Sequence, residues 1–265
     1  HERHLLPVFA PLAIAASMSP VFWISYLGFS STYVLNLYYA FEQQAVSQSG
    51  IFTPITIKAI IFSNLVFFIF LFVKTKLKIK TMDLLGKGKS FVFEKVKLSE
   101  KHLKILLLLI LVFSFLSRTL WLGSPKNEYF DEVYHAFTAR QILNGKTEPW
   151  EWWNTPPEGF AFEWTHPPLA KLGMVVGMLI FGENSFGWRI PGAMMGVGSV
   201  LLVYLIAKKI FKDELLGILS AGVFSLDGLP LVMSRIGMND SYLLFFVLLS
   251  IYLFLADKLF LSAIA

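Results

Sequence analysis

Two adjacent carboxylates, Asp131 and Glu132, are the first pair along this sequence that could carry out acid–base chemistry. They lie between Phe130 and Val133, so a carboxylate here can be partly desolvated, which makes it a better general base. Neighbouring residues of a helix point in different directions. We therefore expect only one of the two to react and the other to hold a partner. An ordinary hydrated acidic loop is the alternative.

A histidine forms the centre of a second group further along the chain. His166 precedes Pro167 and Pro168, which suit the first turn of a helix because proline fixes φ and lacks a backbone donor. His166 could ligate a metal, donate to a phosphate or cap that helix. Since sequence alone does not place His135 beside it, no metal site is predicted, and a divalent metal stays unsupported. We assign substrate-binding or structural roles to four residues: His166, His135, Trp164 and Asp240.

Three arginines complete the candidate site. Arg189 stands at the outer end of an apolar stretch, Arg118 lies near the end of an earlier one, and Arg235 lies shortly before Asp240. A guanidinium is a planar, permanently charged donor that can clamp phosphate oxygens. We predict phosphate binding for all three arginines. The alternative is that they anchor helices at the membrane surface by snorkelling.

The composition requires an apolar environment for these residues. Apolar residues make up 55% of the 265-residue chain and charged residues only 15%, whereas a soluble domain carries about 25% charged residues. The absence of cysteine excludes disulfides, thiolate catalysis and cysteine-ligated zinc. The sequence begins with His1 rather than Met. We expect a membrane protein, and a piece of a longer enzyme that would not act alone.

Apolar stretches predict the helices that must position the site, since a span needs about 20 mostly apolar residues. They cover residues 5–18, 21–41, 59–73, 105–122, 190–207, 215–233 and 242–256. Another stretch, 169–181, is shorter and is interrupted by Lys171, which favours a helix lying along the membrane surface. The predicted fold class is therefore all-α: a polytopic membrane bundle with an amphipathic helix in its outer loop.

Lysines set the predicted orientation of this bundle. Residues 74–104 carry ten lysines, and such a loop is cytoplasmic by the positive-inside rule. If 169–181 does not cross the membrane, the basic cluster of Lys208, Lys209 and Lys212 is cytoplasmic as well. The loop 123–189 and the turn 229–240 then share the outer face. This places the acidic pair, His166, the outer arginines and Asp240 on one side.

The order of four short motifs carries a family resemblance. They are Phe130-Asp131-Glu132-Val133, Thr165-His166-Pro167-Pro168-Leu169-Ala170-Lys171, Trp188-Arg189-Ile190-Pro191, and Ser234-Arg235 with Asp240. From 105 to 265 the chain resembles the amino-terminal half of protein O-mannosyltransferases, which belong to the GT-C superfamily of polyprenyl-phosphate-sugar-dependent glycosyltransferases. The resemblance implies that Asp131 is the base and that Arg189 helps to hold the donor phosphate. Trp164 stands where the eukaryotic pattern has Asp, which leaves the acceptor class in doubt.

The front of the chain has a resemblance of its own. His1-Glu2-Arg3-His4-Leu5-Leu6-Pro7 and Leu35-Asn36-Leu37-Tyr38-Tyr39 are similar to the late helices of a bacterial GT-C glycosyltransferase. Residues 1–73 are thus predicted to be the tail of a preceding module, 74–104 a basic cytoplasmic linker, and 105–265 the start of a GT-C module. An unusual amino-terminal extension is the alternative.

The resemblance implies an activity. A mannosyl or other hexosyl unit would pass from a polyprenyl-phosphate carrier to a Ser or Thr hydroxyl of a protein, on the extracytoplasmic face of the plasma membrane. The expected partners are the lipid-linked sugar, a protein or lipid acceptor and membrane lipid, with no nucleic acid. Alternatives are a transferase that glycosylates lipid or polysaccharide, as aminoarabinose transferases do, and a non-enzymatic transporter or scaffold. Only Asp227, inside an apolar stretch, fits a transporter.

Overall fold

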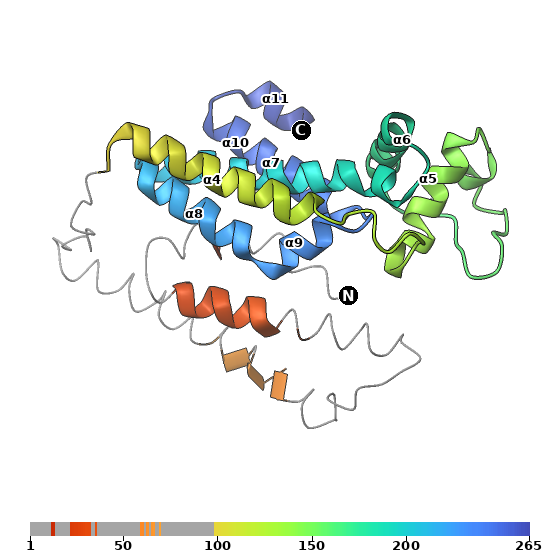
Figure 1. Cartoon of the computed structure of the whole chain (residues 1–265), viewed down its shortest axis with the longest axis horizontal. Coiled ribbons are helices and arrows are strands. Elements are labelled where there is room, and N and C mark those ends of the chain that lie inside the picture. The colour runs from red at the N-terminus through yellow and green to blue at the C-terminus, as the bar shows by residue number, and fades with distance from the viewer. Residues whose placement is uncertain are drawn as a thin grey trace.

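Helices form all the regular structure that the computed structural model of the chain describes (Figure 1). The described residues are 12, 13, 22–32, 35, 59, 60, 62, 63, 65, 66, 69 and 98–265. No strand occurs within these ranges. The predicted all-α fold class is therefore confirmed.

Within the described residues, two helices are long and apolar enough to cross a membrane: α4 (Glu100–Thr119) and α7 (Ser185–Phe211). The side chain of Ser99 accepts a hydrogen bond from the backbone of His102 and so caps α4. At 20 residues α4 spans about 30 Å, the thickness of the hydrocarbon core. Its surface is rich in exposed apolar side chains, which is expected of a helix that faces lipid: Ile105, Leu108, Leu109, Val112, Phe113, Phe115 and Leu116.

The predicted span 215–233 is not one straight helix. It is divided into α8 (Glu214–Leu226) and α9 (Gly228–Ser234), which are bent by 64° relative to each other. Asp227 lies at the break, where its Oδ1 accepts a hydrogen bond of 2.9 Å from the backbone of Leu229 and caps α9. Asp227 was the residue that favoured a transporter. Its carboxylate has a structural function here, because it caps the start of α9.

Shorter helices make up the rest of the described part. The outer loop holds η2 (Phe130–Val133), α5 (His135–Leu143) and η3 (Glu148–Trp150). It ends in α6 (Leu169–Phe181), which has 13 residues and begins directly after Pro168, as the sequence predicted. α10 (Asp240–Leu255) has 16 residues and is followed by α11 (Leu259–Ile264).

α7 is the central helix of the bundle, and α4, α6, α8 and α10 all pack against it. Its buried side chains, such as Val200 and Val203, share one apolar core with Ile218 and Phe224 of α8. A side chain at Gly196 would lie 2.8 Å from Nε of Arg118, so glycine at this position lets α4 and α7 approach closely. The core thus fixes where the end of each helix lies.

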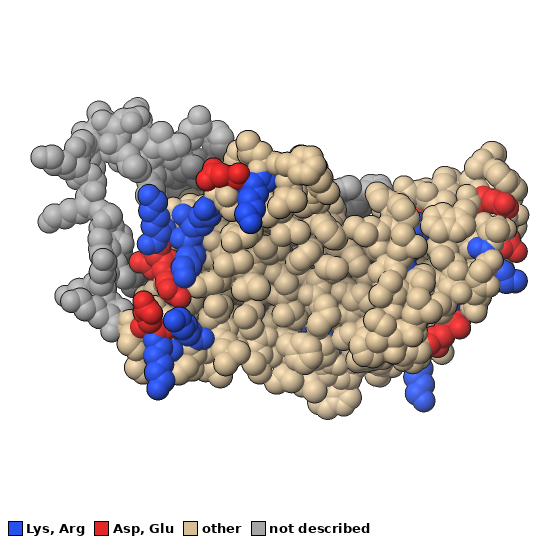
Figure 2. Space-filling model, turned by 90° about the horizontal axis from the view of Figure 1, so that it is seen from above, with Lys and Arg blue, Asp and Glu red and all other residues tan. Residues whose placement is uncertain are grey.

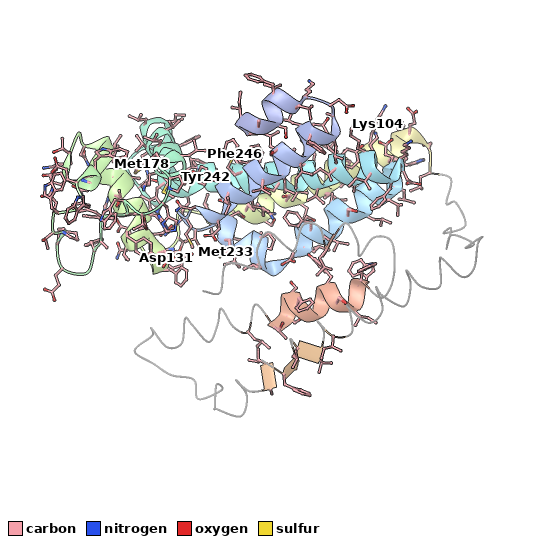
Figure 3. The ribbon with its side chains drawn as sticks, turned by 180° about the vertical axis from the view of Figure 1, so that it is seen from behind. Lys104, Asp131, Met178, Met233, Tyr242 and Phe246 are labelled. Carbon is pink, nitrogen blue, oxygen red and sulfur yellow. The ribbon has the colours of Figure 1, made fainter. Side chains whose placement is uncertain are left out.

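Charged side chains gather towards the two ends of the molecule, as Figure 2 shows, and uncharged residues form a broad band between them. Lys104, near the start of α4, and Asp131, just beyond the end of α4, lie at opposite ends of the bundle (Figure 3). An uncharged band between two polar ends is the pattern of a protein that lies in a bilayer. The chain is a membrane protein.

One part of the predicted amino-terminal module is described. Residues 22–32 are helical. Tyr26, within this helix, donates a hydrogen bond of 2.5 Å to Oδ2 of Asp227. Ser30 donates to Oδ1 of the same carboxylate at 3.1 Å. These buried contacts join the helix at 22–32 to the α8–α9 break. The lysine-rich segment up to residue 97 and most of the predicted helices 5–18 and 59–73 lie outside the described residues, and the division into modules stays a prediction.

Candidate active site

The carboxylate of Glu132 is fully buried and accepts hydrogen bonds from two distant parts of the chain, α7 and the segment that follows α9. Oε1 accepts from Nε of Arg189 at 2.7 Å, from the backbone of Gly237 at 2.7 Å and from the indole of Trp188 at 3.1 Å. Oε2 accepts from Nη2 of Arg189 at 2.7 Å. We call η2 with this carboxylate the Glu132 turn. Glu132 is therefore the carboxylate of the pair that holds a partner, and its hydrogen bonds connect the loop after α4 to α7.

Arg189 uses its whole guanidinium inside the chain. Besides its two bonds to Glu132, Nη1 donates to the carbonyls of Leu122 and Pro125, and Nη2 donates to the carbonyl of Asn127. These five bonds match the five N–H donors of an arginine. A contact between Arg189 and a donor phosphate, as predicted, would require one of these five hydrogen bonds to break. The geometry thus favours a structural function, in which Arg189 holds the segment between α4 and η2.

The backbone of the Glu132 turn has an unusual conformation. Phe130 has a φ of 56°, a left-handed conformation that a bulky L residue rarely adopts. Such strain persists only where surrounding contacts enforce it, and it is often found at functional sites. The bonds to Glu132 supply that enforcement. Asp131, between the two, is 8% exposed, and its catalytic role stays a prediction.

The other two arginines differ in how many of their donors are used. Arg235 donates to the carbonyls of Ser117 at 2.5 Å and Leu120 at 2.8 Å, which stabilises the C-terminal end of α4. Arg118 is fully buried and Nη1 donates to the side chain and the carbonyl of Ser114. Its Nε and Nη2 have no hydrogen-bond partner among the residues that the structure describes. Unused donors make Arg118 the arginine best suited to accept an anion.

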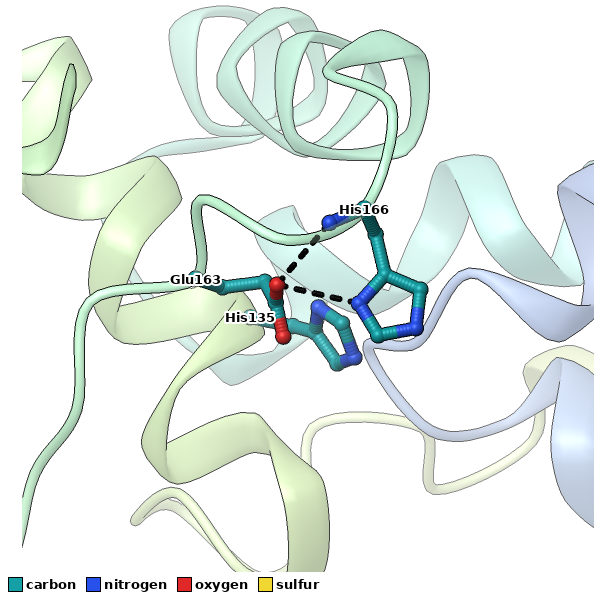
Figure 4. Close-up of side chains that lie close together, drawn as sticks. All are labelled: His135, Glu163 and His166. Carbon is teal, nitrogen blue, oxygen red and sulfur yellow. Dashed lines mark hydrogen bonds and ion pairs between the residues drawn. The ribbon is translucent and has the colours of Figure 1, made fainter. Parts of the chain in front are cut away.

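A second cluster surrounds residues 163–166, which we call the Glu163 turn. Oε1 of Glu163 accepts hydrogen bonds from the backbone and hydroxyl of Thr165, and from the backbone of His166. Nδ1 of His166 lies 2.9 Å from the same oxygen. The rings of His166 and His135 have their centres 5.5 Å apart. The two histidines that sequence could not bring together are thus neighbours (Figure 4).

The Glu163 turn is held from both sides. Thr138, on α5, accepts a buried hydrogen bond of 2.8 Å from the backbone N–H of Glu163. Lys171, on α6, donates from Nζ to the carbonyl of Glu163, and to that of His166 at 3.0 Å. The turn is therefore fixed to the helix that carries His135 and to the helix that follows the two prolines.

Charges around the Glu163 turn favour an ionised carboxylate. Burial acts to raise the pKa of Glu163, but hydrogen bonds from Thr165 and His166 and the charges of both histidines outweigh burial and lower the pKa to about 2. Burial lowers the pKa of Lys171, and the charge of Glu163 partly offsets this. The turn thus presents a carboxylate that is negative at neutral pH.

The remaining predicted residues lie around these two turns. Trp164 is half-exposed beside His166, and Asp240 is partly buried in the first turn of α10. The loop also exposes Trp150, Trp152 and Trp153, which fits either an interface belt or a stacking surface. Residues that sequence reasoning did not assign to the site are Thr138, Glu163, Lys171, Trp188 and Gly237. Of these, Trp188 could have been proposed from the sequence, because its indole is next to Arg189.

Together these features define a polytopic all-α membrane protein whose buried and ionised residues are gathered at one end of the bundle. Residues 108–260 match the family model described as dolichyl-phosphate-mannose-protein mannosyltransferase. This match covers more than half of the chain, and the chain belongs to that family. The resemblance found from the four motifs is confirmed, and the matched region contains every residue of both turns.

The similar proteins include two kinds of named transferase. The polyprenol-phosphate-mannose–protein mannosyltransferase of Mycobacterium tuberculosis is 34% identical over 129 residues, which cover 49% of this chain and 23% of that protein. The protein of that name from Mycolicibacterium smegmatis is 32% identical over 146 residues, covering 54% of this chain and 27% of that protein. The undecaprenyl phosphate-alpha-4-amino-4-deoxy-L-arabinose arabinosyl transferase of Pseudomonas aeruginosa is 30% identical over 122 residues, covering 46% and 21%. The chain thus spans about a quarter of the length of these relatives. No solved structure matches it.

Proposed function

We propose that the chain is the amino-terminal part of a glycosyltransferase that moves a mannosyl unit from a polyprenyl-phosphate carrier to a Ser or Thr hydroxyl of a protein. The observation that carries this is the Glu132 turn, which lies in the family-matched region and holds Asp131 at one end of the bundle. A lipid-linked donor requires a site at the membrane surface, because its tail stays in hydrocarbon while its sugar meets water. We place that site on the extracytoplasmic face of the plasma membrane.

Asp131 is the catalytic base in this proposal. It accepts the hydroxyl proton as the acceptor oxygen forms a bond to the anomeric carbon and the bond from that carbon to the phosphate oxygen breaks. The lipid phosphate leaves with the electron pair, and a single displacement inverts the anomeric centre. Glu132 and Arg189 do not touch substrate but position Asp131.

Stabilisation of the departing phosphate is assigned first to Arg118, because its buried guanidinium retains donors that no described residue uses. Charge that develops in the transition state is stabilised most by donors that are already in place. Arg235 is the second candidate, because its bonds to the end of α4 place it beside the same helix terminus.

Replacing Asp131 with Asn in the full-length protein tests the proposal. A positioned general base contributes about 10²–10⁴-fold to a rate, so D131N should lower mannosyl transfer from polyprenyl-phosphate-mannose to a Ser/Thr peptide by that factor. E158Q, which changes an exposed acid of the same loop, is the matched control and should keep the full rate. In the same assay R118A should raise the donor concentration that gives half the maximal rate. Near-normal transfer by D131N would remove Asp131 from the base position.

A lipid acceptor is the second candidate function, because a relative named as an aminoarabinose transferase shares 30% identity over 122 residues. Offering the purified protein a lipid acceptor beside the peptide separates the two. Transfer to lipid but not to peptide would show that the acceptor is a lipid rather than a protein. The proposed roles of Asp131 and Arg118 would be unchanged.

A further inference from the structure

Three side chains of the outer loop converge on one point: His135, Glu163 and His166. One ligand-capable atom from each lies within 4.8 Å of the other two. They come from the start of α5 and from the Glu163 turn, which are 28 or more residues apart in sequence. Figure 4 shows the Glu163 carboxylate directed towards both imidazole rings. We propose that these three residues bind a divalent transition-metal ion of the zinc class.

The donor set selects this class of ion. Two imidazole nitrogens and one carboxylate oxygen form the ligand set of several catalytic zinc sites, in which a fourth position is left for water or substrate. Imidazole suits Zn²⁺ and its transition-metal neighbours, whereas Mg²⁺ and Ca²⁺ prefer oxygen ligands alone. The set therefore favours Zn²⁺ over Mg²⁺.

The distances require only a small adjustment. Zinc bonds of about 2.0–2.2 Å at tetrahedral angles place two ligand atoms about 3.4 Å apart. The three ligand atoms lie at most 4.8 Å from one another, so each separation exceeds the zinc-bound value by no more than about 1.4 Å. Rotation of the half-exposed His166 side chain can supply that movement, because 50% of its surface is free of contacts.

The surroundings hold the ligands in place before any ion binds. Thr138, three residues after His135 on α5, accepts a hydrogen bond from the backbone of Glu163, and Lys171 donates to the carbonyls of Glu163 and His166. Thr165 donates to the carboxylate itself at 2.5 Å. Outer hydrogen bonds of this kind orient ligands and are a regular part of metal sites. His135 is buried and His166 half-exposed, so the cluster is rigid at its base and open to solvent on one side.

The inference stands apart from the proposed transfer reaction, although His135 follows Asp131 by only four residues. An ion at this point would bring a positive charge close to the proposed base and offer an open coordination position there. Because the experiment below contains no sugar donor, its failure leaves the proposed function untouched, and failure of the transfer assay leaves the metal site untouched.

Metal binding to the purified full-length protein in detergent tests the site. Zn²⁺ affinity is measured by competition with a chromophoric chelator, and Co²⁺ is used as a spectroscopic probe of coordination. We expect one Zn²⁺ per chain and a visible Co²⁺ spectrum of four- or five-coordinate type, with no competition from millimolar Mg²⁺. Loss of outer hydrogen bonds alone weakens metal sites by about 10–100-fold, so E163Q and H166A should each weaken Zn²⁺ binding by at least about 100-fold.

The choice of variants keeps the outcome decisive. His135 is fully buried and its replacement could unfold the chain, so E163Q and H166A carry the test. H102A changes an exposed histidine at the start of α4 and is the matched control; it should bind Zn²⁺ as the wild type does. The proposal is overturned if the wild type binds Zn²⁺ no more tightly than E163Q and H166A, or if Mg²⁺ displaces Co²⁺.

Discussion

The Glu132 turn and the Glu163 turn lie in the same loop between α4 and α6, and each contains a buried carboxylate, yet their surroundings differ. Around Glu132 every acceptor position is filled by the chain, and Arg189 supplies the full compensating charge. Around Glu163 two imidazoles and a carboxylate converge, and one imidazole is open to solvent. A carboxylate whose charge is fully compensated inside the chain is suited to positioning the residue beside it. An open group of convergent ligands is suited to binding.

The strongest test of this comparison is to remove the negative charge from each turn. E132Q leaves the buried guanidinium of Arg189 without its counter-charge, and breaking a buried pair in this way costs about 3–5 kcal/mol. E163Q leaves no buried arginine unpaired, and Lys171 keeps the two backbone carbonyls to which its Nζ donates. We expect E132Q to lower the free energy of unfolding by several times more than E163Q, measured by denaturant titration in mixed micelles.

A suitable control for that experiment is E100Q, which changes the exposed ion pair between Glu100 and Lys104. Exposed pairs contribute little to stability, so E100Q should leave the unfolding curve unchanged. Equal losses in E132Q and E163Q would show that the two turns do not differ in the way described.

A smaller effect is expected when the support of the Glu163 turn is weakened. T138V keeps the side-chain shape but leaves the buried N–H of Glu163 without its acceptor, which costs about 1–3 kcal/mol. The same variant should weaken Zn²⁺ binding while the Glu132 turn stays intact. T155V, at an exposed threonine of the loop, serves as the control. If T138V unfolds like the wild type, Thr138 does not hold the turn.

The smallest effect is expected when the Glu132 turn loses one of its donors. W188F removes the indole N–H at 3.1 Å but leaves Arg189 and the backbone of Gly237 on the same oxygen. A typical hydrogen bond contributes about 0.5–1.5 kcal/mol net, and because the remaining donors still satisfy this oxygen, the loss should be near the lower value. Thermal unfolding of W188F beside E132Q measures the difference. A loss as large as that of E132Q would assign the stability to Trp188 rather than to the ion pair.

The sequence predicted the helices well where one apolar stretch forms one helix. The predicted spans 105–122 and 190–207 correspond to α4 and α7, and the stretch 169–181 is the short helix that was expected. The prediction was less accurate at 215–233, where Asp227 caps a new helix and the chain bends. α7 also begins five residues before the predicted start, because Asn184 caps it and Pro191 is accommodated inside the helix. Caps and bends depend on single side chains, which an average over an apolar stretch does not detect.

For the candidate site, sequence supplied the arginines, the acidic pair and the two histidines, but neither Glu163 nor the partners of these residues. Adjacent positions in a helix diverge, so it was possible to expect that Asp131 and Glu132 would differ in function. That Glu132 binds Arg189, 57 residues away, was not predictable from spacing. The same is true of His135 and His166, which are brought together by the turn that Thr138 and Lys171 hold.

The sequence by itself determined that this chain lies in a membrane, that it is helical and which family it resembles, because hydrophobicity, helix length and short motifs are properties of local segments. The tertiary structure alone decided which carboxylate is saturated, which arginine retains unused donors and which side chains converge as possible metal ligands. The physical reason is that pairing of buried charges depends on the packing of α4, α5, α6 and α7 against one another, and those contacts join residues that are far apart in the chain.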